Sequence, residues 1–280
     1  MGDPFRLLAV LAHPDDESLG LGSTLAAYAA RGVETFLVTA TRGEQGRFHG
    51  VSNGMPPHPG PEGLAKVRER ELRAAAATLG VREVNFLDYQ DRLVDRADPR
   101  EAIARLVAHV RRIRPQVVVT FPPDGAYGHP DHIAVSQMAT AAIVAAADST
   151  FATASDNDAM PYAVSKLYYV AWVESTWAIY QKAFRRMIST VDGVERQAVP
   201  WPDWAVTTIV DTGDFWRVAW RAIACHESQV ANYDGLKNLA PEQQETLWRT
   251  QAFYRAFSLV NGGRRRETDL FEGIETDAYP

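Results

Sequence analysis

The chain has 280 residues, a formal net charge of −6, and hydrophobic residues make up 46% of it. This size and composition are ordinary for a globular protein with one large domain or two small ones, and the acidic charge argues against nucleic acid or an anionic membrane surface as partners. The only cysteine, Cys225, excludes an intrachain disulfide framework or cysteine-rich zinc site, and because no apolar run reaches about 18 residues we expect a cytoplasmic protein without a membrane span.

The first half of the chain alternates between short apolar runs and longer amphipathic stretches. The apolar runs predict strands over Leu7–Ala12, Glu34–Thr41, Val84–Leu87 and Val117–Phe121. The stretches between and after them predict helices over Leu21–Ala30, Glu62–Leu79, Pro99–Ile113 and Pro130–Ala147, with Asp98 as the cap of the third. This alternation predicts an α/β fold with a Rossmann-like, mostly parallel sheet flanked by helices, in strand order 3-2-1-4.

Two long loops interrupt the alternation. Gly43–Pro61 is rich in glycine, proline and polar residues, and a compact domain rarely keeps such a loop without a functional reason. Asp148–Pro161 is a plausible seam between two parts of the chain. We therefore expect a Rossmann-like metal-site core over residues 1–150. A smaller C-terminal part over residues 151–280 is expected to complete the sheet and cover the pocket.

The C-terminal part is expected to contain strands and a helix of its own. The pattern predicts strands over Val164–Trp172 and Val206–Val210 and a helix over Asp214–His226. Most of the tryptophans lie in this part and are placed to roof a pocket. The Cys225-His226 pair ends the predicted helix, where a buried structural cysteine is the favoured interpretation over a nucleophile pair.

Clusters of polar side chains follow the first and fourth predicted strands. The first cluster contains His13, Asp15, Asp16 and Glu17, and the second contains Asp124, Tyr127, His129, Asp131 and His132. In the 3-2-1-4 order these strands are neighbours, and the crevice at their carboxyl ends is where open α/β proteins bind ligands. The two clusters are therefore expected to form one site.

The spacing within the clusters indicates a metal site. His13 and Asp16 are three residues apart, as are His129 and His132, so each pair lies on one side of a first helical turn. Two histidines and one aspartate with a vacant position are typical of catalytic Zn²⁺, and Fe²⁺ or another divalent metal is compatible with the same set. We predict His13, Asp16 and His132 as ligands. The cation would also keep the crowded carboxylates ionised.

The remaining residues of the clusters suggest a metal-assisted amide hydrolase. Asp15, next to a ligand but pointing elsewhere, is expected to take a proton from the attacking water. His129 is expected to donate to the developing oxyanion or the leaving amine, with Asp131 holding it protonated and Tyr127 as a second oxyanion contact. Two interpretations of Glu17 stay open: it orients His13 as a hydrogen-bond partner, or it faces solvent.

A purely structural interpretation of these residues is the alternative to the metal site. Asp15, Asp16 and Ser18 are good helix-capping residues, and a single histidine is more often structural than a ligand. The occurrence of two His/Asp clusters after two neighbouring strands favours a functional site over this alternative.

The motifs "AHPDDE" and "GHPDH", at Ala12–Glu17 and Gly128–His132, resemble the signatures of the PIG-L/LmbE-like zinc N-deacetylases. "GEQG" and "RERELRAAAATLGV" resemble the acidic loop and the following helix of that family. "HESQ" and "ETDLFEG" are similar to C-terminal segments of its mycothiol-pathway branch, which includes a deacetylase and an S-conjugate amidase. "VSKLYYV" resembles the amidase, although Leu19 and Gly20 stand where that enzyme carries a lysine.

The resemblance implies a Rossmann-like fold and Zn²⁺-dependent hydrolysis of an N-acyl group on a small aminosugar conjugate. It gives His13, Asp16 and His132 as metal ligands, Asp15 as the general base, His129 as the group that assists the tetrahedral intermediate and Tyr127 as an oxyanion donor. It also implies that Glu44, Arg68 and either Asp91 or Asp88 contact the sugar. A homo-oligomer is compatible with the sequence.

Three functions follow as hypotheses. The leading one is removal of an N-acetyl group from an N-acetylglucosaminyl-type conjugate. The second is an amidase that cleaves a larger acyl group from a glucosaminyl conjugate. The third, from another class, is a metal-stabilised sugar-binding protein without turnover, which the presence of every expected catalytic residue disfavours.

Overall fold

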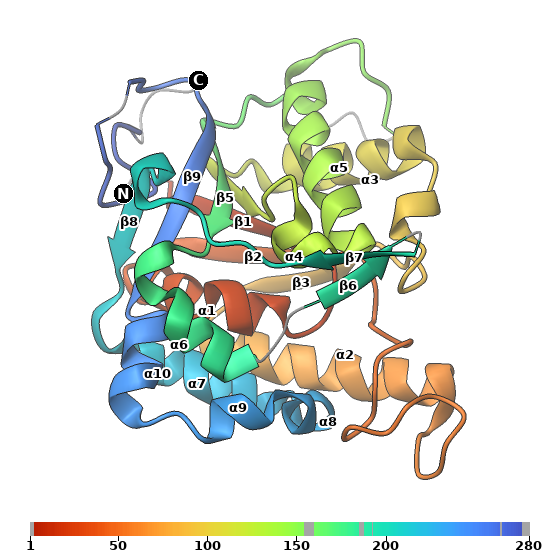
Figure 1. Ribbon diagram of the computed structural model, residues 1–280. Coiled ribbons are helices and arrows are strands. Elements are labelled where there is room, and N and C mark those ends of the chain that lie inside the picture. Colours follow the sequence, from red (N-terminus) through yellow and green to blue (C-terminus); the bar gives the residue numbers. More distant parts are fainter. Residues whose placement is uncertain (1–2, 154–159, 185–187, 192, 264, 276–280) are drawn as a thin grey trace.

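The computed structural model describes residues 3–153, 160–184, 188–191, 193–263 and 265–275. Its centre is a seven-stranded sheet in the order β3-β2-β1-β4-β5-β9-β8 (Figure 1). The strands are β1 Arg6–Leu11, β2 Glu34–Thr39, β3 Glu83–Phe86, β4 Val117–Thr120, β5 Lys166–Ala171, β8 Thr208–Asp211 and β9 Thr250–Ser258. β1 to β5 run parallel to one another, whereas β9 is antiparallel to its two neighbours, β5 and β8. The predicted 3-2-1-4 order and the mostly parallel sheet are confirmed.

Strand β1 lies near the middle of the sheet because its sequence is apolar on both faces. Leu7, Leu8 and Ala9 are completely buried, and Leu11 is 2% exposed. A strand in a parallel sheet needs such a run, because helices cover both of its faces. β1 pairs with β4 through Leu7–Val117, Leu8–Val118 and Ala9–Val119, so the carboxyl ends of the two strands lie side by side.

Helices cover both faces of the sheet (Figure 1). α3 (Pro99–Ile113) and α5 (Pro130–Ala147) pack together on one face, and α1 (Asp16–Ala30), α2 (Gly60–Leu79) and α7 (Trp216–Cys225) pack on the other. The bounds of α3 and α5 are those predicted, and the Asp98 carboxylate caps α3 by accepting from the backbone N–H groups of Arg100 and Glu101. α1 begins at Asp16 rather than at the predicted Leu21, because the acidic residues form its first turn.

The C-terminal half adds strands to the same sheet and several elements that the sequence did not predict. These are α6 (Glu174–Phe184), the hairpin of β6 (Ile188–Val191) and β7 (Val194–Gln197), α8 (Glu227–Val230), α9 (Asp234–Lys237), α10 (Pro241–Trp248) and β9. Residues 154–159 of the predicted seam lie outside the described residues. The division of the chain near residue 150 stays a prediction. In the described part of the chain, the helices are too short or too polar to cross a membrane.

Candidate active site

The candidate site lies where β1 and β4 end. Residues 12–15 lead from β1 into α1, and residues 121–132 lead from β4 through the short helix α4 (Gly125–Gly128) into α5. Pro130 is at the first position of α5 and His129 is its N-cap, as the sequence predicts. His13 and His129, just before α1 and α5, and Asp16 and His132, in their first turns, therefore project into the same crevice.

The three predicted metal ligands lie close together. His13 Nδ1 is 3.1 Å from His132 Nε2, and the Asp16 carboxylate oxygens are 3.7 Å from His13 Nδ1 and 3.6 Å from His132 Nε2. Tetrahedral bonds of about 2.0–2.2 Å to one zinc ion place neighbouring ligand atoms roughly 3.3–3.5 Å apart. The nitrogen and oxygen donors thus fit a divalent metal in both chemistry and spacing. His129 also groups with His13 and His132 within 4.8 Å.

The other ring nitrogen of His13 faces two carboxylates. His13 Nε2 is 3.2 Å from Asp131 Oδ2 and 3.2 Å from Asp91 Oδ1. Asp131 is fully buried, and its carboxylate also accepts from the backbone N–H groups of Arg92, at 2.6 Å, and Val94, at 3.1 Å. A carboxylate behind the remote nitrogen of a histidine ligand fixes its tautomer and orientation, which leaves Nδ1 of His13 free for a metal.

The pKa directions in the site follow from burial and mutual charge. Burial alone lowers the pKa of His13, but hydrogen bonds to Asp131 and Asp91 outweigh it and raise the pKa to about 10. Burial raises the pKa of Asp16 to about 7, with the charges of Asp15 and Glu17 adding to the shift against that of His13. Burial and then the charge of His13 lower the pKa of His132. The buried acids thus require a positive charge at this position, which a divalent metal held by His13, Asp16 and His132 would supply.

Asp15 has a backbone conformation that directs its side chain into the pocket. Its φ of 113° and ψ of −25° are rare for a residue other than glycine, and such conformations cost of order 1–3 kcal/mol. Although Asp15 is the N-cap of α1, its side chain makes no capping bond. Its carboxylate instead accepts from Tyr233 Oη at 2.8 Å and lies 3.3 Å from the Arg68 guanidinium. The capping alternative is therefore wrong for Asp15.

His129 and Tyr127 lie on the opposite side of the crevice. His129 Nδ1 accepts from the backbone N–H of Asp131 at 3.2 Å, so the neutral ring carries its proton on Nε2. Burial and the charge of His13 lower the pKa of His129 to about 4. The predicted pairing of the Asp131 carboxylate with His129 is not found, because among the described residues that carboxylate hydrogen-bonds His13 and backbone amides instead. The Tyr127 ring lies 5.1 Å from that of His132.

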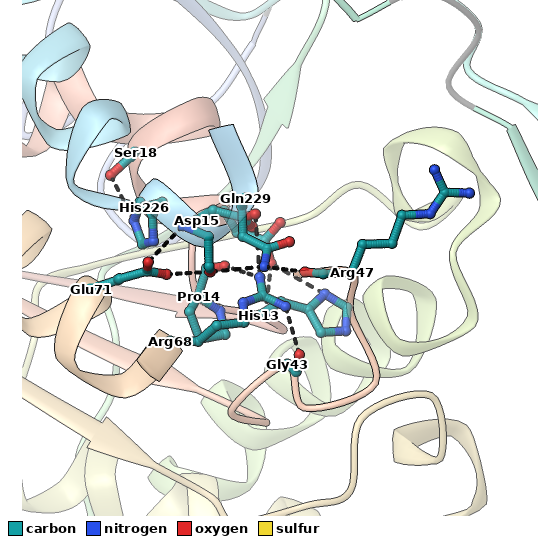
Figure 2. Close-up of polar contacts among 12 residues, drawn as sticks. His13, Pro14, Asp15, Ser18, Gly43, Arg47, Arg68, Glu71, His226 and Gln229 are labelled. Carbon is teal, nitrogen blue, oxygen red and sulfur yellow. Dashed lines mark hydrogen bonds and ion pairs between the residues drawn. The ribbon is translucent and has the colours of Figure 1, made fainter. Parts of the chain in front are cut away.

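Arg68 is buried against the loop that follows β2 (Figure 2). Its guanidinium donates to the carbonyl oxygens of Gly43 and Pro14 and lies beside Asp15. Gly43 has a φ of +64°, and a Cβ atom there would lie 2.0 Å from Arg68 Nη1. Only glycine leaves room for this approach.

The surroundings differ among the other residues predicted to contact the sugar, which are Asp91, Asp88 and Glu44. Asp91 is 5% exposed, lines the pocket and accepts from the backbone N–H of Gln45. Asp88, the alternative to Asp91, has a side chain that is 62% exposed and pairs with Arg42. The Glu44 carboxylate accepts from the backbone N–H of Asp91 at 2.8 Å and supports that residue from behind. The geometry favours Asp91 over Asp88 as a pocket residue.

A cavity of about 310 Å³ contains these groups and extends along an aromatic wall. The wall includes Trp172, Tyr180, Phe184 and Trp201, with ring centroids 4.4 Å apart for Trp172–Tyr180 and 4.6 Å for Tyr180–Phe184. These residues and Tyr233 are pocket residues that sequence reasoning did not name. In the sequence, the only indication of these wall residues is that most of the tryptophans lie in the C-terminal half. Nothing in the sequence indicates that Tyr233 belongs to the pocket.

Cys225 and His226 do not form a pair. Cys225 is free and half-buried rather than buried, with its Sγ 3.4 Å from the Arg221 carbonyl oxygen. His226 is 1% exposed, and its Nε2 lies 2.7 Å from Glu17 Oε1. Glu17 is therefore not solvent-facing, and its carboxylate contacts His226 rather than His13.

Fold and site together define an α/β protein with a buried His/Asp cluster, suited to a divalent metal, at the switch point of its sheet. A family model described as "PIG-L: GlcNAc-PI de-N-acetylase" matches residues 8–143. The chain is 36% identical, over 98% of its length and 84% of the relative, to a 1D-myo-inositol 2-acetamido-2-deoxy-alpha-D-glucopyranoside deacetylase of Kineococcus radiotolerans. It is 35% identical to the Streptomyces avermitilis protein of the same description, over 96% of this chain and 97% of that one. The chain belongs to the PIG-L deacetylase family, which confirms the resemblance.

Solved structures confirm the fold. N,N'-diacetylchitobiose deacetylase from Pyrococcus horikoshii aligns with a TM-score of 0.64 and 20% identity, over 90% of this chain and 84% of that one. The 4-carboxy-2-hydroxymuconate hydratase GalB from Pseudomonas putida aligns with a TM-score of 0.68 and 19% identity, over 92% and 99%. Because a hydratase and a deacetylase share this fold, the reaction has to be argued from the site.

Proposed function

We propose that the protein is a zinc-dependent N-deacetylase that removes the acetyl group from a small N-acetylglucosaminyl conjugate. His13, Asp16 and His132 hold the metal. The observation that carries the proposal is that these three donors lie within 3.1–3.7 Å of one another. The Asp15 carboxylate lies next to them and makes no capping hydrogen bond to α1. The descriptions of the Kineococcus and Streptomyces relatives support the same reaction type.

A divalent metal at this position would polarise the carbonyl of the amide and lower the pKa of the attacking water. Asp15 then accepts the proton of the attacking water, for which its carboxylate is available inside the pocket. Tyr233 and Arg68 contact the same carboxylate and hold it in place.

His129 and Tyr127 act on the carbonyl side of the amide. Because His129 Nδ1 accepts from the backbone N–H of Asp131, its Nε2–H is available to hydrogen-bond the developing oxyanion. The leaving amine takes the proton that Asp15 accepted from the attacking water. Tyr127, whose pKa burial raises well above its usual value, stays protonated and donates a second hydrogen bond. Asp131 acts through His13, whose ring it orients, rather than through His129.

Arg68 and Asp91 contact the sugar hydroxyls, and Glu44 holds Asp91 in position. Arg68 and Asp91 line the cavity and are buried, as groups that recognise a small polar ligand must be. Glu44 contacts the backbone of Asp91 and is a positioning residue.

The aromatic wall favours a second candidate, cleavage of a larger acyl group from the same aminosugar. Trp172, Phe184 and Trp201 offer apolar surface to a group larger than a methyl. An acyl series on glucosamine, from acetyl to phenylacetyl, separates the two activities by their kcat/KM values.

The decisive experiment is an acetate-release screen over N-acetylglucosaminyl conjugates with the apoprotein, the Zn²⁺-loaded protein and the Fe²⁺-loaded protein. We expect about one metal per chain in the active protein, and acetate release that chelation abolishes and Zn²⁺ restores. Acetate release by the chelated protein would contradict the metal dependence. If the loaded protein binds the sugars but cleaves neither the acetyl nor the larger amides, the third hypothesis, a sugar-binding protein without turnover, replaces the proposal.

A further inference from the structure

The carboxylate of Glu17 joins the backbone of Asp15 to a histidine far away in the chain. Glu17 Oε2 accepts from the Asp15 backbone N–H at 3.0 Å, and Glu17 Oε1 lies 2.7 Å from His226 Nε2, across 209 positions of sequence. Both side chains are buried, with Glu17 0% and His226 1% exposed. A buried carboxylate needs such donors, because an unpaired charge in the interior is strongly disfavoured.

This contact replaces the usual cap of α1. In a capping box, the N-cap side chain satisfies a backbone N–H of the first turn, and an acidic side chain of that turn reaches back to the N-cap N–H. Here Glu17 makes the backward contact, but the Asp15 side chain makes no capping bond and points into the pocket. Glu17 thus holds Asp15 as the N-cap while its carboxylate remains available to Tyr233 and Arg68.

His226 holds the Glu17 carboxylate together with Ser18, whose hydroxyl donates to the same Oε1 atom. His226 is the residue between α7 and α8, and the Ser18 hydroxyl lies 3.5 Å from its Nε2 (Figure 2). α8 is fixed separately to α2, because Glu71 accepts from the Ser228 backbone N–H at 2.7 Å and from the Ser228 hydroxyl at 2.6 Å. The His226 ring therefore sits on a segment anchored to a helix other than α1.

We propose that Glu17 and His226 form a positioning pair that holds the rare backbone conformation of Asp15 and so aims its carboxylate at the reacting water. The proposal rests on the proposed role of Asp15 as the general base. Neither residue touches the substrate, and neither is a metal ligand. Through this pair, the general base Asp15 in the N-terminal motif depends on His226, a residue of the C-terminal half.

Glu17→Gln is the first test. Glutamine keeps the length of the side chain but has one acceptor oxygen, so its amide N–H₂ faces either the Asp15 N–H or the His226 Nε2–H. Moving the histidine proton to Nδ1 gives no relief, because that buried atom has no hydrogen-bond partner among the described residues. We expect kcat to fall by about 10- to 100-fold, while KM and metal content stay within about twofold of the wild-type values.

His226→Leu and the double variant test whether the two residues act as one unit. His226→Leu removes one of the two side-chain donors to Glu17 Oε1 and leaves the Ser18 hydroxyl as the other, and we expect the same loss of kcat as in Glu17→Gln. The double variant should lose about as much as either single variant rather than the product of both losses. Glu71→Gln is the matched control: it alters a carboxylate that holds the same segment of chain without touching Asp15, and its kcat should stay near that of the wild type.

Three outcomes overturn the proposal. An unchanged kcat in Glu17→Gln shows that Asp15 does not need the pair. Loss of bound metal at retained folding shows that the pair serves Asp16 instead. Loss of the cooperative thermal transition in both single variants identifies a purely structural bridge. A wild-type protein that cleaves no amide contradicts the proposed function itself, which distinguishes that failure from the failure of the pair.

Discussion

At the scale of single residues, the crowded acids after β1 have different partners. Asp16 turns its carboxylate toward the two histidines and accepts from the His13 backbone N–H at 2.7 Å. Asp15 contacts Arg68 and Tyr233, and Glu17 contacts His226. Because each carboxylate meets a donor from a different element, the three acids do not share one cation.

Asp15→Asn and Asp16→Asn should separate catalysis from metal binding. Asparagine at 15 keeps the shape of the side chain but cannot accept the water proton, so we expect kcat to fall by about 10²- to 10⁴-fold with the metal retained. Asparagine at 16 replaces a charged ligand, so we expect loss of the metal together with activity. Metal content after dialysis, measured beside kcat, checks both. Equal metal loss in the two variants would contradict the division between base and ligand.

Gly43→Ala tests whether Arg68 needs its close approach to the backbone. Gly43 and Gly50 both have positive φ angles, +64° and +84°, but a Cβ atom collides with Arg68 only at position 43 and meets open space at position 50. Both alanine variants carry a similar backbone strain, so the difference between them reports the displaced guanidinium. We expect kcat/KM to fall at least ~10-fold in Gly43→Ala and to change less than ~2-fold in Gly50→Ala. Equal values would show that Arg68 moves without consequence.

The sequence predicted the residues whose spacing is local and missed those brought in from afar. His13 with Asp16 and His129 with His132 could be found because the members of each pair are three residues apart shortly after a strand, although only Asp16 and His132 lie in a helix. Tyr233 and the partner of Glu17 could not, since 218 and 209 positions separate the bonded residues. No periodicity in the chain records such contacts.

At the scale of elements, regular βαβ units were predictable and the C-terminal additions were not. α3 and α5 each begin with a proline that directly follows a capping residue, and this pattern predicts where they start. β9 extends the sheet by antiparallel pairing with β5 and β8, and its partners depend on the register of the whole sheet. Residues 172–201, which contain α6 and the β6–β7 hairpin, contribute the aromatic wall to a pocket that the N-terminal half begins.

Trp201→Ala should weaken substrate binding, with Trp204→Ala as the matched control. Trp201 lines the cavity and packs on Tyr254 with ring centroids 5.1 Å apart, whereas Trp204 is 81% exposed and three residues away. Burial of an apolar side chain against a ligand contributes about 1.5–3 kcal/mol, so we expect KM to rise about 10- to 100-fold with little change in kcat. Thermal melting of both variants separates this effect from lost packing. A KM unchanged from that of Trp204→Ala would show that the substrate does not reach the wall.

At the scale of the whole molecule, a buried network joins the segment after β9 to the sheet. Glu267 is 1% exposed, and its carboxylate bonds Lys166 Nζ of β5 at 2.7 Å, Tyr168 Oη at 2.6 Å and Thr208 Oγ1 of β8 at 2.8 Å. Arg255 of β9 lies 2.7 Å from the same carboxylate. The network therefore links three neighbouring strands to the segment "ETDLFEG", Glu267–Gly273, which is similar to a C-terminal segment of the mycothiol-pathway branch.

Glu267 should make part of the stability depend on pH. Burial alone would raise the pKa of this carboxyl, but hydrogen bonds from Lys166, Tyr168 and Thr208 outweigh it and lower the pKa from 4.5 to about 2. A carboxyl with a lowered folded pKa stabilises fully above its unfolded value and loses that contribution as the pH falls through the folded one. We therefore expect about 2–3 kcal/mol of the free energy of unfolding to be present above pH ~4.5 and lost toward pH ~2.

Glu267→Gln isolates this contribution from the other acid-sensitive groups. At pH 7 the variant should be less stable than the wild type by about 3 kcal/mol, because Lys166 and Arg255 keep buried charges without their carboxylate. The difference in stability should shrink as the pH falls from 4.5 toward 2, because the wild-type carboxyl then becomes protonated and is uncharged like the glutamine amide. Glu83→Gln, which breaks the more exposed pair with Arg112, should differ from the wild type by less than ~1 kcal/mol throughout. Urea titrations at several pH values measure the difference, and a constant gap for Glu267→Gln would show that its carboxylate is not what links acid stability to the C-terminal segment.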